Sequence, residues 1–226
     1  MKAIRILRHA TLAGSLLTLI LTPLTSQTLS KDQLARPVRV KLDQVNTPDA
    51  VAQALLDADV PGGITVLHYC GGFPTRSLKL RSASVRGLLD EVVSADPNYS
   101  WRLNEGVVNL IPRYTKLHFL DTRVSKLDLK EKTPDEALNI LLALPEVQSQ
   151  ANNELGSRAF QGFAYAYPPN ADRQQQKTFS LVLTDTTVAE ALNAIAKAYG
   201  SAVWVLAKNE CNNGGRRNFS IKFIYI

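Results

Sequence analysis

Cysteine and histidine are scarce in this sequence, and the common arrangements of catalytic residues are absent. Two cysteines and three histidines occur among 226 residues. Neither His68 nor His118 has the spacing of a zinc site, so the sequence predicts no metal centre. There is no Gly-x-Ser-x-Gly motif and no glycine-rich loop that joins a strand to a helix as in phosphate-binding sites. We therefore expect no catalytic residue, no metal ligand and no cofactor.

Long hydrophobic runs are confined to the amino terminus. Lys2, Arg5 and Arg8 precede an apolar stretch at 10–24, and the small polar residues Thr25 and Ser26 follow. This pattern predicts a signal peptide over residues 1–26 and a periplasmic or secreted mature protein. Gly14 and Pro23 interrupt the apolar stretch, which falls short of the ~20 strongly apolar residues of a membrane helix. An uncleaved amino-terminal anchor is the alternative, and no membrane span is expected after cleavage.

A strong excess of positive charge is also lacking once the leader is removed. Residues 1–26 contain three basic residues and no acidic ones, so their removal lowers the formal net charge from +6 to +3. The remaining basic and acidic residues are nearly balanced, which is typical of a mixed surface and not of one that binds polyanions. We therefore expect that nucleic acid is not a partner.

The expected export of the protein determines how its two cysteines are interpreted. Cys70 and Cys211 are the whole cysteine content of the chain. An oxidising compartment permits a disulfide between them. The alternative is two separate thiols, buried as small apolar side chains.

An internal repeat organises the rest of the chain. Thr47-Pro48-Asp49 recurs 86 residues later as Thr133-Pro134-Asp135, each time before an amphipathic helical pattern. Threonine is a preferred N-cap, proline fits the first helical position, and aspartate favours the positive helix end. A second offset of 103 residues aligns the Ser-Leu-x-Leu segments at 77–80 and 180–183, as well as Trp101 with Trp204. These coincidences favour a duplication over accident.

The two halves therefore have the same predicted order of elements. In the first half we expect helices at 48–58 and 85–95 and strands at 38–45, 64–70, 77–82, 99–104 and 107–111. In the second half we expect helices at 134–144 and 188–199, the latter closed by Gly200, and strands at 123–129, 162–167, 178–183, 202–207 and 219–225. The glycine pairs at 62–63, 71–72 and 214–215 are expected in turns, 145–161 in a long loop and 112–116 in a connector.

The fold class that follows is α+β, with two similar β-α-β-β-α-β-β domains at 27–115 and 116–226. Each would pack a small sheet on two helices. The segments 76–89, 99–103 and 107–111 of the first half, together with 179–204 of the second, resemble the secretin and TonB short N-terminal (STN) domain. The resemblance implies a protein-docking domain of the cell envelope, possible in two copies over nearly the whole mature chain. Its known hosts place this domain ahead of a barrel or a ring-forming domain, and no such sequence follows here, so no pore or transport role is expected.

Candidate binding residues come from two clusters. Phe163, Tyr165 and Tyr167 alternate with small residues, which indicates one face of a strand or an aromatic patch for a partner or a sugar ring. Arg76, Lys79, Arg81 and Arg86 form a basic cluster, which indicates a solvated face or a surface for an acidic partner. The apolar run 219–226 either closes a sheet or pairs with a partner strand.

From these features we expect an exported, non-enzymatic protein that docks an envelope protein and has no membrane span after cleavage. A glycan- or peptidoglycan-binding module is the alternative, and a hydrolase with an unmarked carboxylate pair is the weaker one. The sequence predicts neither the identity of the partner nor the oligomeric state.

Overall fold

The protein is a mixed α+β structure in which helices and strands alternate along the chain. A computed structural model describes residues 31–38, 47–69, 84–155, 177–210 and 218–225. The first half contains α1 (Lys31–Leu34), α2 (Thr47–Asp57), β1 (Gly62–Tyr69), α3 (Val85–Ala95), β2 (Tyr99–Asn104) and β3 (Val107–Pro112). The second half contains η1 (His118–Asp121), β4 (Arg123–Lys132), α4 (Pro134–Leu142), α5 (Pro145–Leu155), β5 (Phe179–Thr187), α6 (Val188–Tyr199), β6 (Ala202–Glu210) and β7 (Asn218–Tyr225). The α+β class is confirmed.

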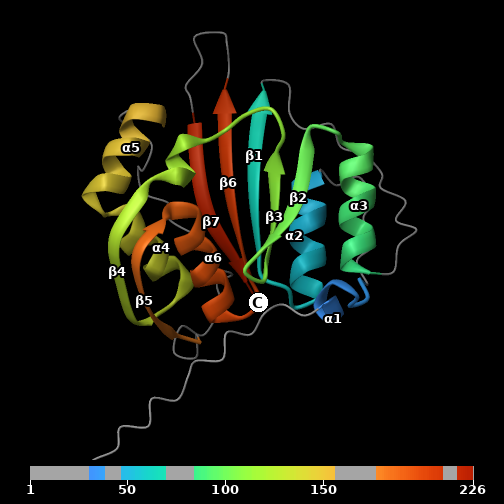
Figure 1. Ribbon diagram of the computed structural model, residues 1–226, viewed down its shortest axis with the longest axis horizontal. Coiled ribbons are helices and arrows are strands. Elements are labelled where there is room, and N and C mark those ends of the chain that lie inside the picture. The colour runs from blue at the N-terminus through green and yellow to red at the C-terminus, as the bar shows by residue number, and fades with distance from the viewer. Residues whose placement is uncertain (1–30, 39–46, 70–83, 156–176, 211–217, 226) are drawn as a thin grey trace, which may run out of the picture.

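One five-stranded sheet runs through both halves in the order β2-β3-β1-β6-β7 (Figure 1). Strand β1 lies at its centre and is parallel to both β3 and β6. The β2–β3 and β6–β7 pairs are antiparallel hairpins on either side of it. The sheet of the first half is thus continuous with that of the second, which differs from the expected pair of small separate sheets. The pattern of apolar residues in a segment predicts that the segment is a strand but does not specify which strand it pairs with. The sequence therefore did not predict this pairing.

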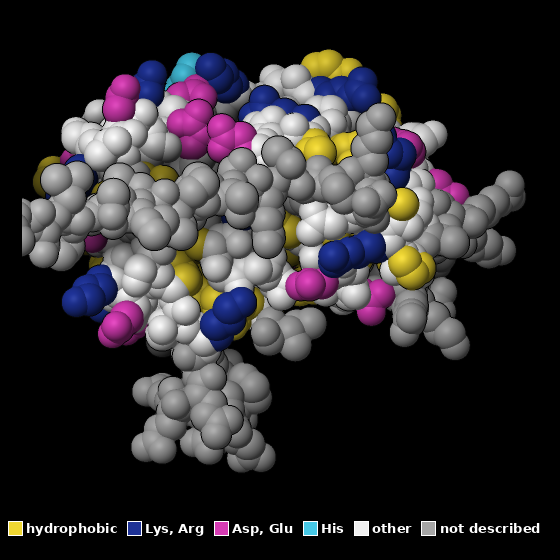
Figure 2. All heavy atoms as spheres, turned by 60° about the horizontal axis from the view of Figure 1, so that its bottom comes forward, with side chains coloured by type: hydrophobic (Ala, Val, Ile, Leu, Met, Phe, Trp, Pro, Cys, Tyr) yellow, Lys and Arg dark blue, Asp and Glu magenta, His cyan; other side chains and the backbone are white. Residues whose placement is uncertain are grey.

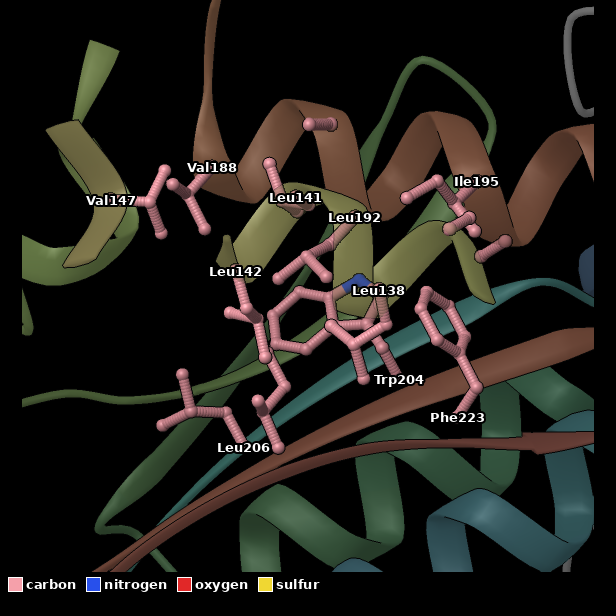
Figure 3. Packing of buried hydrophobic residues seen from close by; sticks show 14 of the residues in the cluster. Leu138, Leu141, Leu142, Val147, Val188, Leu192, Ile195, Trp204, Leu206 and Phe223 are labelled. Carbon is pink, nitrogen blue, oxygen red and sulfur yellow. The ribbon is translucent and has the colours of Figure 1, made fainter. Parts of the chain in front are cut away.

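The two faces of the sheet are covered by different halves of the chain. In Figure 1, α2 and α3 lie on one side, and α4, α6 and the two-stranded β4–β5 sheet lie on the other. On the first side Ile64, Val108 and Val203 join the buried side chains of α2 and α3. On the second side Trp204 packs beneath α4 and α6 beside Leu138, Leu192 and Phe223 (Figure 3).

Gly62 and Gly63 open strand β1 and allow both layers to approach it closely. A Cβ on Gly62 would lie 2.5 Å from the Leu55 side chain, and a Cβ on Gly63 would lie 2.2 Å from the Trp204 indole. Successive residues of a strand face opposite sides of the sheet. The missing side chain of each glycine therefore lets one of the two layers pack against the strand backbone. The expectation of a turn at 62–63 was wrong, because glycine here serves close packing and not a change of chain direction.

Several predicted helix ends are confirmed. Thr133 is the N-cap of α4 with Pro134 at its first position, and the Thr133 and Glu136 side chains form a capping box. Helix α6 has the predicted bounds and ends at Gly200, whose φ is +114°. The hairpin turn between β2 and β3 places Glu105 and Gly106 at φ +46° and +90°, as a two-residue turn with two positive φ values requires.

Helix α5 replaces most of the loop that the sequence predicts at 145–161. It begins at Pro145, a residue suited to the first turn of a helix. Val147 and Ala151, four residues apart, are fully buried and belong to the same apolar cluster as Trp204. The rest of the helix is largely polar, so the apolar spacing was too sparse to predict it. The expected strands at 77–82 and 162–167 and most of 38–45 lie outside the described residues.

The two halves contain equivalent interactions at the two sequence offsets. Trp101 Nε1 donates to Asp90 Oδ1 at 2.9 Å, and Trp204 Nε1 donates to Asn193 Oδ1 at 2.8 Å. Each pair spans 11 residues between a strand and the preceding helix, and the pairs are 103 residues apart. The amides that start α3 and α6 also correspond, since Val85 N donates to Arg36 O at 3.1 Å and Val188 N donates to Thr122 O at 3.0 Å.

The two equivalent tryptophan hydrogen bonds differ in burial, so we expect them to contribute differently to the free energy of unfolding. Trp204 is 1% exposed and Asn193 is 9% exposed, whereas Asp90 faces solvent. We expect Asn193→Ala to lower the free energy of unfolding by about 1–3 kcal/mol, because it leaves a buried indole N–H without its acceptor. Asp90→Ala is the matched control and should cost less than about 1 kcal/mol, because water can replace the lost acceptor. Urea unfolding measures both, and equal losses would contradict this account.

Glu190 gives the start of α6 a pH dependence. The Thr187 backbone N–H donates to Glu190 Oε2 at 2.7 Å and lowers the pKa of this carboxyl group below its usual value of 4.5, helped by the Thr187 and Thr186 hydroxyls. A lowered pKa in the folded state stabilises the protein above the unfolded pKa, and this contribution is lost as the pH falls through the folded value. We expect the free energy of unfolding to fall less steeply between pH 6 and pH 3 in Glu190→Gln than in the wild type. Parallel curves from denaturant titrations across this range would disprove the coupling.

Cys70 and Cys211 both lie outside the described residues, but the sheet bears on their pairing. Tyr69 and Glu210 are register partners at the end of the β1–β6 ladder. Each is followed directly by one of the cysteines. Because paired strands lie about 4.8 Å apart, the residues that directly precede the two cysteines are neighbours across the ladder.

We therefore predict that Cys70 and Cys211 form a disulfide in an oxidising compartment. Intact mass and peptide mapping without reduction should show the two cysteine peptides joined. Cys70→Ser and Cys211→Ser should each release one free thiol and lower the melting temperature by similar amounts, since either change opens the same loop. Two thiols that titrate freely in the folded, unreduced wild type would contradict the prediction.

Candidate functional site

Most residues that the sequence singled out for binding lie outside the described part of the chain. This applies to Phe163, Tyr165 and Tyr167 of the aromatic cluster and to Arg76, Lys79 and Arg81 of the basic cluster. Arg86, the last member of the basic cluster, is described. Its guanidinium lies over the Trp101 ring, 5.5 Å from the ring centroid, in a cation–π contact. The structure thus places one member of the basic cluster, Arg86, against strand β2.

His118 belongs to a short 3-10 helix. It opens η1, where its backbone N–H donates to Glu154 Oε1 at 3.1 Å. Among the described residues, no three histidine, cysteine, aspartate or glutamate side chains gather as a metal site would require. His68 belongs to β1.

Strand β2 forms an outer edge of the five-stranded sheet. Val108 N donates to Pro61 O at 3.1 Å, so Val108 turns its backbone groups toward β1 and Asn109 turns its own toward β2. Arg102 is the register partner of Asn109. Because the direction alternates along a strand, the backbone N–H and C=O groups of Trp101 and Leu103 point away from the sheet, where no described strand lies.

The side chains along this edge divide by chemistry. Trp101 and Leu103 lie on the α3 side, and Leu103 is a large apolar residue that is 39% exposed. Arg102 lies on the opposite side and is exposed. A chain laid along β2 would therefore meet an apolar strip on one face and a positive charge on the other.

A pocket of about 500 Å³ adjoins β2 on the Arg102 side. Its floor is the sheet, represented by Thr65 of β1, Arg102 of β2 and Ile111 of β3. Its walls are the connector that follows β3, with Arg113 and Lys116, together with η1 and the start of α6. The connector at 112–116 was predicted only as a link between domains, and here it lines a cavity instead.

Positive charge predominates around this pocket. Arg113 Nε donates to Tyr99 O at 2.8 Å, which holds the guanidinium beside the end of β2. Lys116 Nζ lies 2.9 Å from Asp121 Oδ2 in an exposed ion pair. Asp121 is the one carboxylate among the described lining residues, so these residues do not supply the two facing carboxylates that glycoside hydrolysis needs.

Thr65 lines the floor of the pocket, but its hydroxyl oxygen is buried and closed to solvent. Thr65 is 2% exposed, and its Oγ1 has no partner among the described residues. The neighbouring residues Ile64 and Val66 face the opposite apolar layer. Sequence reasoning did not single out Thr65, Arg102, Arg113 or Lys116, because nothing in their spacing shows that the connector folds back over the sheet.

The wider surface carries both charges. On the face shown in Figure 2, basic and acidic side chains are interspersed. Within the described part of the chain, no helix has the length and apolar character needed to cross a membrane. Comparison with protein-family models, with curated proteins and with solved structures found no match to this chain.

Proposed function

We propose that this chain is an exported, non-enzymatic docking module of the cell envelope that binds an extended segment of a partner protein along strand β2. The open edge at 101–103 is the observation that carries this proposal. A partner strand would complete the outward main-chain hydrogen bonds of β2 for which no described residue supplies a partner, as in strand addition to other sheets. This mode of binding needs no catalytic group.

The chemistry beside the edge defines the partner segment. Side chains that alternate along an added strand would face the two sides of the sheet in turn. Those on the α3 side would meet Trp101 and Leu103, and those on the other side would meet Arg102 and Arg113. The segment that fits is therefore extended and alternates apolar with acidic residues. The alternating charge and apolar contacts would also select its register.

The leader at 1–26 supports a periplasmic or secreted location, where such a partner would be an envelope protein. The equivalent tryptophan and helix-start hydrogen bonds at offsets of 86 and 103 residues support an origin of the two halves by duplication of an STN-like unit. Under this proposal the copies share one sheet, and the first copy presents the edge that docks the partner.

A proline substitution at the edge tests the proposal. Leu103→Pro removes an outward backbone N–H without removing a hydrogen bond to β3, and Leu103→Thr keeps the N–H as a matched control. Each tagged full chain would be exported in a Gram-negative host and used to capture proteins from the envelope fraction. We expect the wild type to capture a specific protein and Leu103→Thr to capture nearly the same amount. Leu103→Pro should capture at least tenfold less of it than the wild type.

Salt provides a second readout, because an acidic partner segment beside Arg102 and Arg113 should be released more readily at high ionic strength. Circular dichroism and thermal unfolding would check that each variant is folded. Capture by Leu103→Pro equal to that by the wild type would disprove docking at β2. Retention on purified peptidoglycan without any specific protein would instead support the glycan-binding alternative.

A further inference from the structure

The open edge of β2 has a filled counterpart in the second half of the chain. The offset of 103 residues aligns Trp101 with Trp204 and, two positions further on, Leu103 with Leu206. The later pair belongs to β6, which has β1 beside it as a parallel neighbour. Trp204 is 1% exposed and Leu206 is fully buried, whereas Leu103 is 39% exposed. The second half therefore shows how an edge of this kind is occupied.

The backbone groups at the two edges have equivalent directions. Pro61 O accepts from Val108 N at 3.1 Å, so β1 turns Pro61 toward β3 and the next residue, Gly62, toward β6. In a parallel ladder Gly62 bonds to the residues on either side of its register partner, and one of these is Trp204. Trp204 thus directs its backbone groups at β1, as Trp101 directs its own away from the sheet.

The two tryptophan side chains are also held alike. Each indole N–H donates to the preceding helix, in one case to Asp90 and in the other to Asn193. In the second half this orientation places the Trp204 indole over its register partner Gly63, where a Cβ would lie too close to the ring. By this equivalence the Trp101 indole covers the place that an added strand would take, and the residue opposite it must be small.

We propose that the strand docked on β2 runs parallel to it and has a glycine opposite Trp101. This inference rests on the proposed docking at β2 and adds the direction and the register of the partner segment. Glycine within a strand marks a close approach by another group, and an aromatic side chain laid across it covers the bare backbone. Arg86 over the ring and Asp90 at its N–H hold the indole in place before a partner binds.

The charge at the centre of the edge defines the next two residues of the partner. Arg102 corresponds to Val205, which is the register partner of Ile64. An exposed guanidinium at this position instead favours an acidic residue in the partner, because opposite charges on paired strands attract. The position after it faces Leu103 and favours an apolar residue. The partner segment therefore reads glycine, acidic, apolar, with glycine in place of one apolar residue of the alternating pattern.

A second copy of this chain does not offer such a segment on the described strands that could reach the edge. Strand β7 forms the other edge of the sheet, and its sequence NFSIKFIY contains neither a glycine nor an acidic residue. Strand β1 has two glycines, but Ile64 follows them and both of its sides are already paired. The occupant that fits is a segment of a different protein.

The probe is the peptide acetyl-Val-Glu-Gly-Glu-Val-Thr-amide, in which glycine would lie opposite Trp101 and the second glutamate opposite Arg102. Its matched control has alanine in place of the glycine. Binding to the full chain would be measured by calorimetry. We expect the alanine peptide to bind about tenfold more weakly than the glycine peptide, because its methyl group would meet the indole.

Trp101→Leu separates a direct contact from a general preference of the peptides. We expect this variant to bind both peptides equally, because the smaller side chain leaves room for the methyl group. Leu103→Thr keeps the indole and is the matched control, so it should keep the preference for glycine. Circular dichroism would check that both variants are folded.

Photo-cross-linking tests the direction of the bound strand. A benzophenone group would be attached to either end of the glycine peptide, and mass spectrometry would locate the cross-links. A parallel strand should cross-link near Tyr99 from its amino-terminal end and near Asn104 from its carboxyl-terminal end, because β2 runs from Tyr99 to Asn104.

Four results would overturn this inference. They are no binding of the glycine peptide at millimolar concentration, equal binding of both peptides by the wild type, cross-links in the reverse order, and self-association of the wild type that Leu103→Pro abolishes. The last result would show a second copy on the edge. Capture of an envelope protein that depends on the Leu103 backbone is measured separately, so the proposed docking at β2 can hold while this direction and register fail.

Discussion

The rest of the structure depends on the pairing of β1 with strands from both halves of the chain. This strand hydrogen bonds to β3 on one side and to β6 on the other. Its side chains alternate between the two apolar layers, with Ile64 and Val66 in the first and Leu67 against the second. Because Gly62 and Gly63 have no side chains, Leu55 and Trp204 pack directly against the backbone of the strand from opposite faces. The two layers are thereby coupled through one segment of backbone.

This arrangement gives equivalent local interactions unequal surroundings. Trp204 and Asn193 lie under α4 and the strands of the second half, where their hydrogen bond is sealed from water. Trp101 and Asp90 make the same bond at the outer end of the sheet, where it stays exposed. The difference leaves Trp101 available beside an open strand edge, with Arg86 over its ring. The less covered tryptophan is therefore the one suited to meet a partner.

Strand β2 lies between the outer edge of the described sheet and the pocket. Trp101 and Leu103 face the α3 side, whereas Arg102, between them, faces the pocket. Strand alternation thus separates apolar contacts from charged ones by a single residue. The edge offers backbone hydrogen bonds to a long segment, and the pocket beside it is bordered by the cations Arg102, Arg113 and Lys116.

Local signals explain what could be predicted. The bounds of α3, α6 and β2 agree with the sequence predictions because apolar period, capping residues and the Glu105-Gly106 turn act within a few residues. Helix α5 was not predicted, because only Val147 and Ala151 among its described side chains are fully buried.

The sequence by itself determined the α+β class, most element bounds, the capped helices and the two matching offsets, since each depends on neighbouring residues. Only the tertiary structure decided that β1 joins the two halves, that Gly62 and Gly63 serve close packing, and that the connector with Arg113 and Lys116 encloses Thr65. Those features depend on which surfaces meet across long sequence separations, and the packing that selects them is a property of the whole fold.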